Sequence, residues 1–121
     1  MILGIGTDLC AVSRMRRACA NEHFVRKVFL PEEAEYARLK GNPAEHFAAA
    51  FAAKEALAKA SGLGLFGIGL SCVMVRRTES GPAIICTGTL LEKLEALGMK
   101  KCWLSLTHEG GFALAFVVME S

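Results

Sequence analysis

Two carboxylates and two lysines are the side chains in this sequence whose types and spacing suit phosphoryl chemistry. Glu55 lies in an alanine-rich segment with Lys54 beside it and Lys59 four residues later, and Asp8 follows an apolar run. Mg²⁺ usually takes one or two protein carboxylates and completes its shell with water and substrate phosphates. Two carboxylates with neighbouring ammonium groups therefore indicate a Mg²⁺ site that receives a phosphorylated substrate.

The same residues also have plainer interpretations. Glu55 and Lys59 have the i, i+4 spacing of an ordinary surface ion pair, worth about 0.2–0.5 kcal/mol. Asp8 could be a turn residue or could cap a following helix. The metal site requires the fold to bring Asp8 to the helix stripe that carries Phe51 and Glu55.

Other catalytic motifs are absent. Residues 62–67 read GLGLFG and match GxGxxG, but they follow a predicted helix and precede a predicted strand, the reverse of the order in a dinucleotide-binding fold. A loop with Gly62 and Gly64 can still admit the flat or phosphorylated end of a ligand. His108 and Glu109 lack the second histidine of HExxH, and there is no P-loop or G-x-S-x-G.

Composition indicates one globular domain over residues 1–121. The chain has 53% hydrophobic and 21% charged residues, a balance far from that of disordered proteins. The net charge of +2 is too small to indicate nucleic acid, and we expect no such partner. Basic residues nevertheless outnumber acidic ones between positions 9 and 31, and such a stretch suits an acidic protein.

Localisation is predicted to be cytoplasmic. The five cysteines form no CxxC pair and no metal-ligand spacing, so we expect reduced, buried thiols. The first residues lack the basic region of a signal peptide, and the uncharged stretch at 60–75 is too short and glycine-rich to span a bilayer. No membrane association is expected.

The elements that must position these residues follow from periodicity and breakers. A strand at 1–9 would place Asp8 at its C-terminal end, and Ser13 would cap a helix at 14–21. Helices are predicted at 31–39, at 44–60, and at 87–97. Strands at 70–77 and 83–86 form one hairpin, and strands at 101–107 and 112–119 form another around a turn at 108–111. The fold class is α+β, with a mostly antiparallel sheet packed against helices.

Several segments together resemble a known family, and the similarity runs in order from Met1 to Val118. These segments are GIGTDL at 4–9, FAAKEA at 51–56 with KA at 59–60 and GLG at 62–64, GP at 81–82, and SLTH at 105–108 before FA at 112–113. The chain resembles the holo-acyl-carrier-protein synthase family of 4′-phosphopantetheinyl transferases. The strand and helix motifs are weak singly but specific as a pair.

The resemblance implies a fold, an assembly and a reaction. It implies the 4′-phosphopantetheinyl transferase fold in a homotrimer with active sites at subunit interfaces. Phosphopantetheine would pass from coenzyme A to a serine of apo-acyl carrier protein, in fatty acid biosynthesis, with release of 3′,5′-ADP. Asp8 and Glu55 would hold Mg²⁺ as metal ligands, and Lys59 would complete the catalytic set by neutralising phosphoryl charge.

Binding residues carry over from the resemblance in the same way. Coenzyme A would be contacted by Lys54, Lys59, Gly62, Gly64, Pro82 and His108, with His108 near the nucleotide 3′-phosphate. Arg14 and Arg17 would meet the acidic helix of the carrier protein. Ala11 and Ala50 depart from the family, which usually has Glu and Arg at these positions.

Two alternatives remain at this point. The chain could be a non-catalytic oligomeric module that binds an acidic protein through its basic segment. It could also be a transferase for peptidyl or polyketide carrier domains, although relatives of that kind are about twice as long and carry two copies of the fold.

Overall fold

The computed structural model describes residues 1–121 as a mixed α+β fold. Its elements, in chain order, are β1 (Ile2–Ala11), α1 (Val12–Ala18), α2 (Glu22–Val28), α3 (Pro31–Arg38), α4 (Pro43–Ser61), α5 (Gly64–Ile68), the 3₁₀ turn η1 (Leu70–Cys72), β2 (Val73–Thr78), β3 (Gly81–Cys86), α6 (Gly88–Ala96), β4 (Lys101–Glu109) and β5 (Phe112–Glu120). No helix combines the length and apolar character needed to cross a membrane.

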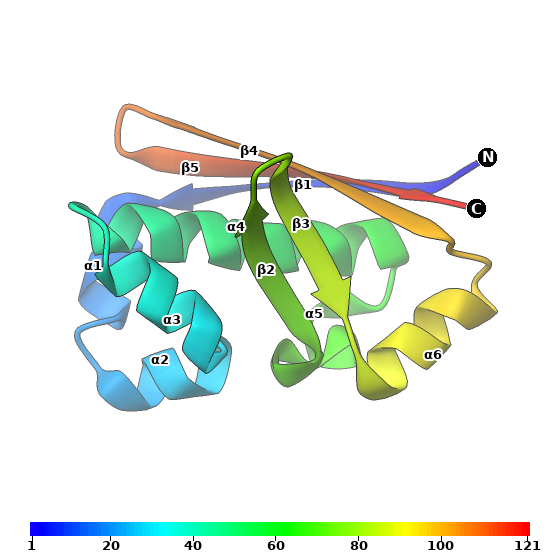
Figure 1. Cartoon of the computed structure of the whole chain (residues 1–121), viewed down its shortest axis with the longest axis horizontal. Helices are drawn as coiled ribbons and strands as arrows, with labels where there is room; N and C mark the ends of the chain where they lie inside the picture. Colours follow the sequence, from blue (N-terminus) through cyan, green and yellow to red (C-terminus); the bar gives the residue numbers. More distant parts are fainter.

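Two antiparallel sheets flank the long helix α4. Strands β1, β5 and β4 form a three-stranded sheet with β5 in the centre, and α4 runs along one face of it (Figure 1). Strands β2 and β3 form a separate hairpin. The α+β prediction with mostly antiparallel pairing is therefore confirmed.

Small residues let α4 lie unusually close to β1. The helix is alanine-rich, and its sheet-facing alanines are fully buried. A Cβ atom added at Gly4 or Gly6 would lie 2.0 Å from the carbonyl oxygen of Ala60 or Ala56, closer than any real contact. Glycine is therefore required at both positions, and this contact fixes the strand that carries Asp8 against the helix that carries Glu55.

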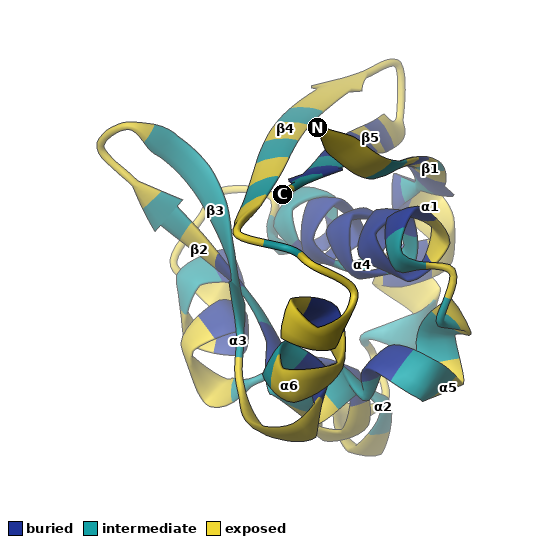
Figure 2. Cartoon of the chain, turned by 90° about the vertical axis from the view of Figure 1, so that its right-hand side faces the viewer, coloured by how far each residue is buried: buried dark blue, intermediate teal, exposed yellow.

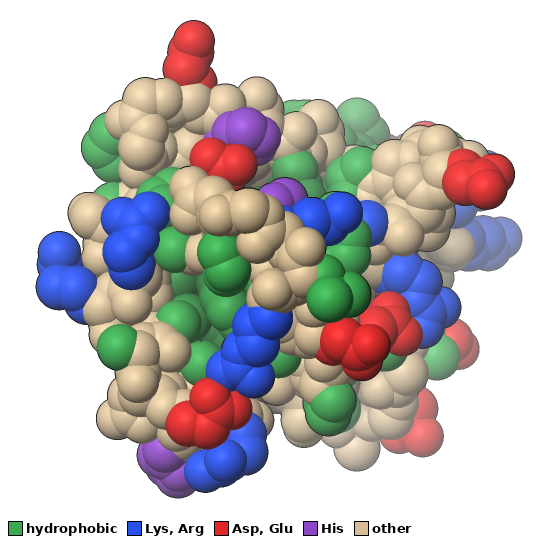
Figure 3. All heavy atoms as spheres, turned by 60° about the vertical axis from the view of Figure 1, so that its left-hand side comes forward, with side chains coloured by type: hydrophobic (Ala, Val, Ile, Leu, Met, Phe, Trp, Pro, Cys, Tyr) green, Lys and Arg blue, Asp and Glu red, His purple; other side chains and the backbone are tan.

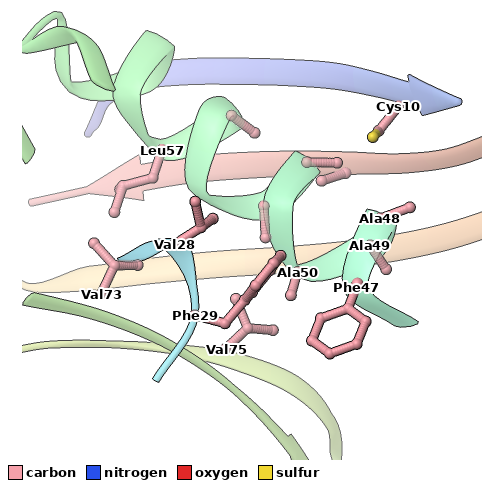
Figure 4. Close-up of a cluster of buried hydrophobic side chains, with 14 of the residues drawn as sticks. Cys10, Val28, Phe29, Phe47, Ala48, Ala49, Ala50, Leu57, Val73 and Val75 are labelled. Carbon is pink, nitrogen blue, oxygen red and sulfur yellow. The ribbon is translucent and has the colours of Figure 1, made fainter. Parts of the chain in front are cut away.

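The core forms around α4, which is the most continuously buried element (Figure 2). On the side away from the sheet, Phe47 packs against Phe29, with ring centroids 4.8 Å apart, and Leu57 lies near Val28 and Val73 (Figure 4). Helix α4 is thus covered by the sheet on one side and by α2, α3 and β2 on the other.

The first strand differs from the prediction at its end. Strand β1 pairs with β5 through Ala11 and Phe112, and α1 begins at the next residue, so Asp8 lies inside the strand. Ala11 occupies the N-cap position of α1 without a side-chain hydrogen bond. The predicted cap at Ser13 is wrong because strand pairing continues to Ala11 and leaves no loop to cap.

Two short helices were not predicted. Helix α2 is capped by Asn21, whose side chain accepts hydrogen bonds from the backbone N–H groups of His23 and Phe24. Helix α5 lies within the segment predicted as a glycine loop. The remaining helices and both hairpins are confirmed, but the turn predicted at 108–111 is shorter. His108 and Glu109 still pair with β5, so only Gly110 and Gly111, both at positive φ, make the turn between β4 and β5.

Candidate active site

Strand β1 and helix α4 bring Asp8, Glu55 and Lys59 together, and we call these three residues the carboxylate cluster. Lys59 Nζ donates to the Asp8 Oδ1, 3.4 Å away, and to the carbonyl oxygen of Thr7, 2.9 Å away. Lys59 therefore pairs with Asp8 across the two elements, and the ion pair with Glu55 that the helix spacing allows is not formed.

Two negatively charged groups lie close together in the carboxylate cluster. Burial raises the pKa of Glu55, and the nearby Asp8 raises it further, while Lys59 and Arg14 act in the opposite direction. A cation bound between the two carboxylates would stabilise the charged form of Glu55. The electrostatic environment of the cluster therefore favours binding of a positively charged ligand.

The residues present fit a hard divalent cation that brings most of its own ligands. No group of three His, Cys, Asp or Glu side chains converges anywhere in the chain, so the protein does not offer a closed metal cage. Two carboxylates without further protein ligands suit Mg²⁺, which retains water and binds substrate phosphates. Asp8 and Glu55 are the residues that would hold it.

The basic first helix borders the carboxylate cluster. The Arg14 guanidinium lies 5.8 Å from the centroid of the Phe51 ring, one helical turn before Glu55. Arg17 lies exposed in the last turn of the same helix. Of the two predicted docking residues, Arg14 therefore presents positive charge beside the carboxylate cluster, and Arg17 lies exposed on the same helix.

Lys54 does not join the carboxylate cluster. Its side chain is fully buried, and Nζ donates to Glu33 Oε1 at 2.7 Å and to the carbonyl oxygen of Val28 at 2.8 Å. Burial lowers the pKa of Lys54, and Glu33 opposes the change. The predicted contact of Lys54 with coenzyme A is thus corrected, because every contact of its ammonium group lies inside the protein.

Gly62 and Gly64 follow Lys59 directly. Both have positive φ, 72° and 74°, and Gly62 ends α4 by donating its N–H to the Lys59 carbonyl oxygen. A Cβ at either position would meet no atom within 4 Å. The glycines are therefore needed for backbone conformation, and they leave open space next to the C-terminal end of α4.

Pro82 and His108 lie in a second group, which we call the β4 cavity. It encloses about 210 Å³ and is lined by Glu45, His46, Ala49, Arg77, Pro82, Leu106, Thr107 and His108. His108 Nδ1 lies 3.2 Å from Glu45 Oε2. Figure 3 shows histidine side chains on this face of the molecule next to acidic and basic side chains.

The two groups lie on opposite flanks of α4. Asp8 is on β1 and His108 is on β4, the two edges of the sheet, with β5 between them. No residue of the β4 cavity affects the pKa of Glu55. In the same way, no residue of the carboxylate cluster affects the pKa of His46. One chain therefore presents two separate half-sites.

Sequence reasoning missed Arg77 and His46 in the β4 cavity. A signal was present for Arg77, because Val73 and Val75 are buried and side chains alternate along β2, so Arg77 faces the same side. Nothing comparable marks His46, whose neighbours in the cavity come from α4, β2, β3 and β4.

Known proteins resemble this chain along its whole length. The family model described as the 4′-phosphopantetheinyl transferase superfamily matches residues 4–117. A curated protein from Geotalea daltonii, named holo-acyl-carrier-protein synthase, is 40% identical over 125 residues and covers 99% of each chain. A protein of the same name from Treponema denticola is 40% identical over 122 residues, with 99% of each chain covered.

Solved structures agree with this result. The holo-acyl-carrier-protein synthase of Neisseria meningitidis superimposes with a TM-score of 0.91 at 34% identity, over 100% of both chains. The corresponding protein of Bacillus anthracis, in complex with coenzyme A (3′,5′-ADP), gives a TM-score of 0.82 at 32% identity over 100% of this chain and 98% of the other.

Proposed function

Because this chain belongs to the 4′-phosphopantetheinyl transferase superfamily and is a phosphopantetheinyl transferase, we propose that it moves phosphopantetheine from coenzyme A to a serine of apo-acyl carrier protein. The acceptor hydroxyl attacks the β-phosphorus and loses its proton to a carboxylate or to water. The bond between the β-phosphorus and the oxygen that bridges the two phosphates breaks, and 3′,5′-ADP leaves with that oxygen. The observation that carries this proposal is the carboxylate cluster of Asp8, Glu55 and Lys59.

Each residue of the carboxylate cluster has a distinct task in the proposed reaction. Asp8 and Glu55 would hold Mg²⁺, which when bound neutralises charge on the diphosphate. Lys59, whose side chain is partly exposed, offers an ammonium group that can leave Asp8 and meet the transferred phosphoryl group. Positioning and charge neutralisation are most of what phosphoryl transfer requires.

The two half-sites support an assembly in which neighbouring subunits complete one another. The outer face of the sheet exposes large apolar side chains that a monomer would leave in water, including Leu9, Trp103 and Phe116. Apolar patches of this kind mark interfaces. We propose a homotrimer packed through this face, with the β4 cavity of one subunit facing the carboxylate cluster of the next.

The proposed protein partner is the acidic helix of an acyl carrier protein, in fatty acid biosynthesis. Arg14 lies beside the carboxylate cluster and Arg17 is exposed on the same helix, so a partner bound to α1 would have its serine near the proposed metal ligands. All five cysteines are free, which supports a reducing cytoplasmic location.

Intact-mass analysis tests the reaction. Apo-acyl carrier protein is incubated with coenzyme A and the protein, with Mg²⁺ or with EDTA, and gain of one phosphopantetheine is expected only with metal. Glu55→Gln removes a charge and little volume, so it should lose at least about 100-fold in rate, the scale of removing one electrostatic stabiliser of a transition state. Glu92→Gln, the same change on the exposed face of α6, is the matched control. Near-normal transfer by Glu55→Gln would reject its role as a metal ligand.

A further inference from the structure

Arg16 belongs to the basic stretch between positions 9 and 31, but the proposed function gives it no role. It follows Arg14 by two residues on α1, which places the two side chains about 160° apart around the helix. Arg16 takes part in none of the ion pairs, and its one side-chain hydrogen bond is long, from Nη2 to Asn42 Oδ1 at 3.4 Å. Most of its donors are therefore available to a ligand.

This arginine borders a cavity, which we call the Arg16 cavity. It encloses about 290 Å³ between the end of α1, the end of α3 and the first turns of α4. Arg38 is the second charged residue in its lining, which contains no carboxylate. Phe47 and Ala44, both buried, make part of the lining apolar. Two guanidinium groups beside an apolar surface suit an anion that carries an apolar chain.

The second arginine is already oriented by contacts within the chain. Arg38 Nη2 lies 2.6 Å from Glu22 Oε2, and the guanidinium carbon lies 6.0 Å from the centroid of the Phe47 ring. A guanidinium has five N–H donors, so this one contact with Glu22 leaves donors for a ligand. Because Glu22 balances the charge of Arg38, the uncompensated positive charge is that of Arg16. A monoanionic head group matches this balance better than a phosphate dianion.

A second cavity lies beyond Arg38, and we call it the α2–α3 cavity. It encloses about 440 Å³ and shares Arg38 with the Arg16 cavity, so the two cavities meet at this side chain. Val25 and Phe29 are buried in its lining, and Leu39 is 78% exposed. Its lining has two acidic and two basic residues, so it has no net attraction for an anion. This cavity suits the uncharged part of a ligand, which would remove apolar surface from water.

We propose that the two cavities together bind a fatty carboxylate. Its carboxylate group would lie between Arg16 and Arg38, where guanidinium forks match the geometry of the head group. Its alkyl chain would follow the apolar lining of the α2–α3 cavity and cover Leu39. No lining residue of either cavity belongs to the carboxylate cluster or to the β4 cavity. The site is therefore separate from the proposed reaction and does not depend on it.

Isothermal titration calorimetry of the whole chain with sodium decanoate, kept below the concentration at which it forms micelles, tests the site. We expect one decanoate per chain, and Arg16→Gln should weaken binding at least about tenfold, the effect of losing one charge-assisted hydrogen bond. Arg76→Gln is the matched control, because Arg76 is exposed, pairs with Glu32 and lines neither cavity. Both arginines are on the surface, so both variants should fold.

Two further ligands separate the contribution of the charge from that of the chain. Decanol lacks the charge and acetate lacks the chain, and each should bind at least about tenfold more weakly than decanoate. Leu39→Ala shortens an exposed side chain and should weaken decanoate binding without affecting the fold. Equal binding of decanoate by the wild-type protein and Arg16→Gln, or equal binding of decanol and decanoate, overturns the proposal.

NMR spectra of the ¹⁵N-labelled protein locate the ligand. Decanoate should shift the backbone N–H resonances around Arg16, Arg38 and Leu39. Shifts that fall instead on Phe112 and Phe116 would place the alkyl chain on the exposed face of the sheet and reject the proposal. These measurements use neither coenzyme A nor carrier protein, so their outcome is independent of whether the proposed transfer occurs.

Discussion

At the scale of single residues, the chemistry depends on which side chains of α4 face which neighbour. Helical spacing correctly predicts that Glu55 and Lys59 share one stripe, and the structure adds Asp8 to them. The closeness of Asp8 to Glu55, which lies 47 positions later in the chain, could not be derived from helical spacing and came from the family resemblance.

Lys54 illustrates the limit of residue-level prediction. Lys54 and Lys59 are five residues apart, which at 3.6 residues per turn places them about 140° apart around the helix. Both look equally available in the sequence, yet one is buried against Glu33 and the other is partly exposed. The difference depends on what packs on each side of α4, and the sequence does not state that directly.

His46 should titrate below the ordinary histidine value, because burial and then the positive charge of Arg77 lower its pKa. The unfolded chain then binds the proton first as pH falls below about 6.5. Stability linked to His46 is therefore present above that pH and is lost as pH drops through the folded value. Histidine NMR titration checks this, and Arg77→Gln should raise the pKa of His46. A pKa that stays the same in that variant would contradict the assigned cause.

At the scale of elements, α4 is held by a buried ion pair as well as by apolar packing. Glu33 of α3 accepts from Lys54 and, through Oε2, from the backbone N–H of Val75 in β2 at 2.8 Å. Oε1 also accepts from the N–H of Leu30. The pair therefore joins α4 to α3 and β2, and it fixes the rotation of the helix that presents Glu55.

Removing one member of this pair should be strongly destabilising. Lys54→Met leaves the Glu33 carboxylate buried without its counter-charge, at an expected cost of about 3–5 kcal/mol in the free energy of unfolding. Adding Glu33→Gln removes the uncompensated charge and keeps an acceptor for Val75 N–H, so the double variant should recover part of the loss. Urea denaturation measures both, and a loss below about 1 kcal/mol for the single variant would mean that the pair is dispensable.

Element boundaries show what sequence patterns can and cannot provide. Helix α4 was predicted to within a residue at each end because its composition and the breakers at 41–43 and 62 agree. Helix α2 has only seven residues, too few for periodicity to stand out, and its Asn21 cap was the available signal. Helix α5 forms despite three glycines in residues 62–67, a composition that predicts a loop.

At the scale of the whole molecule, the outer face of the three-stranded sheet is the feature most at odds with a monomer. Side chains that point away from α4 on its central strand are Phe112, Leu114 and Phe116, all exposed. The neighbouring strands add Leu9 and Trp103 to the same face. Composition showed an excess of apolar residues, but only the strand register locates that excess on one face.

Phe116→Lys should disrupt the proposed trimer. A charge in the middle of this apolar face is unfavourable in an assembly and harmless in an isolated subunit. Sedimentation velocity should show monomers that keep their circular dichroism, and transfer activity should fall with the assembly. Leu39→Lys, at an exposed apolar residue after α3, should leave the trimer intact. A Phe116→Lys trimer with full activity would place the interface elsewhere.

The pairing of β1 with β5 also sets the order of events during synthesis. Nine of the residues in β1 have partners between positions 112 and 120. On the ribosome, β1 emerges first and has no strand to pair with until β5 is made. Until then the sheet is incomplete, and the apolar face of α4 that packs against it stays partly exposed. Contacts this distant along a chain also slow folding. The contacts of Gly4 and Gly6 with α4 can bring Asp8 close to Glu55 before β5 is made. The pairing of β1 with β5, which fixes the position of Asp8 in the sheet, forms last.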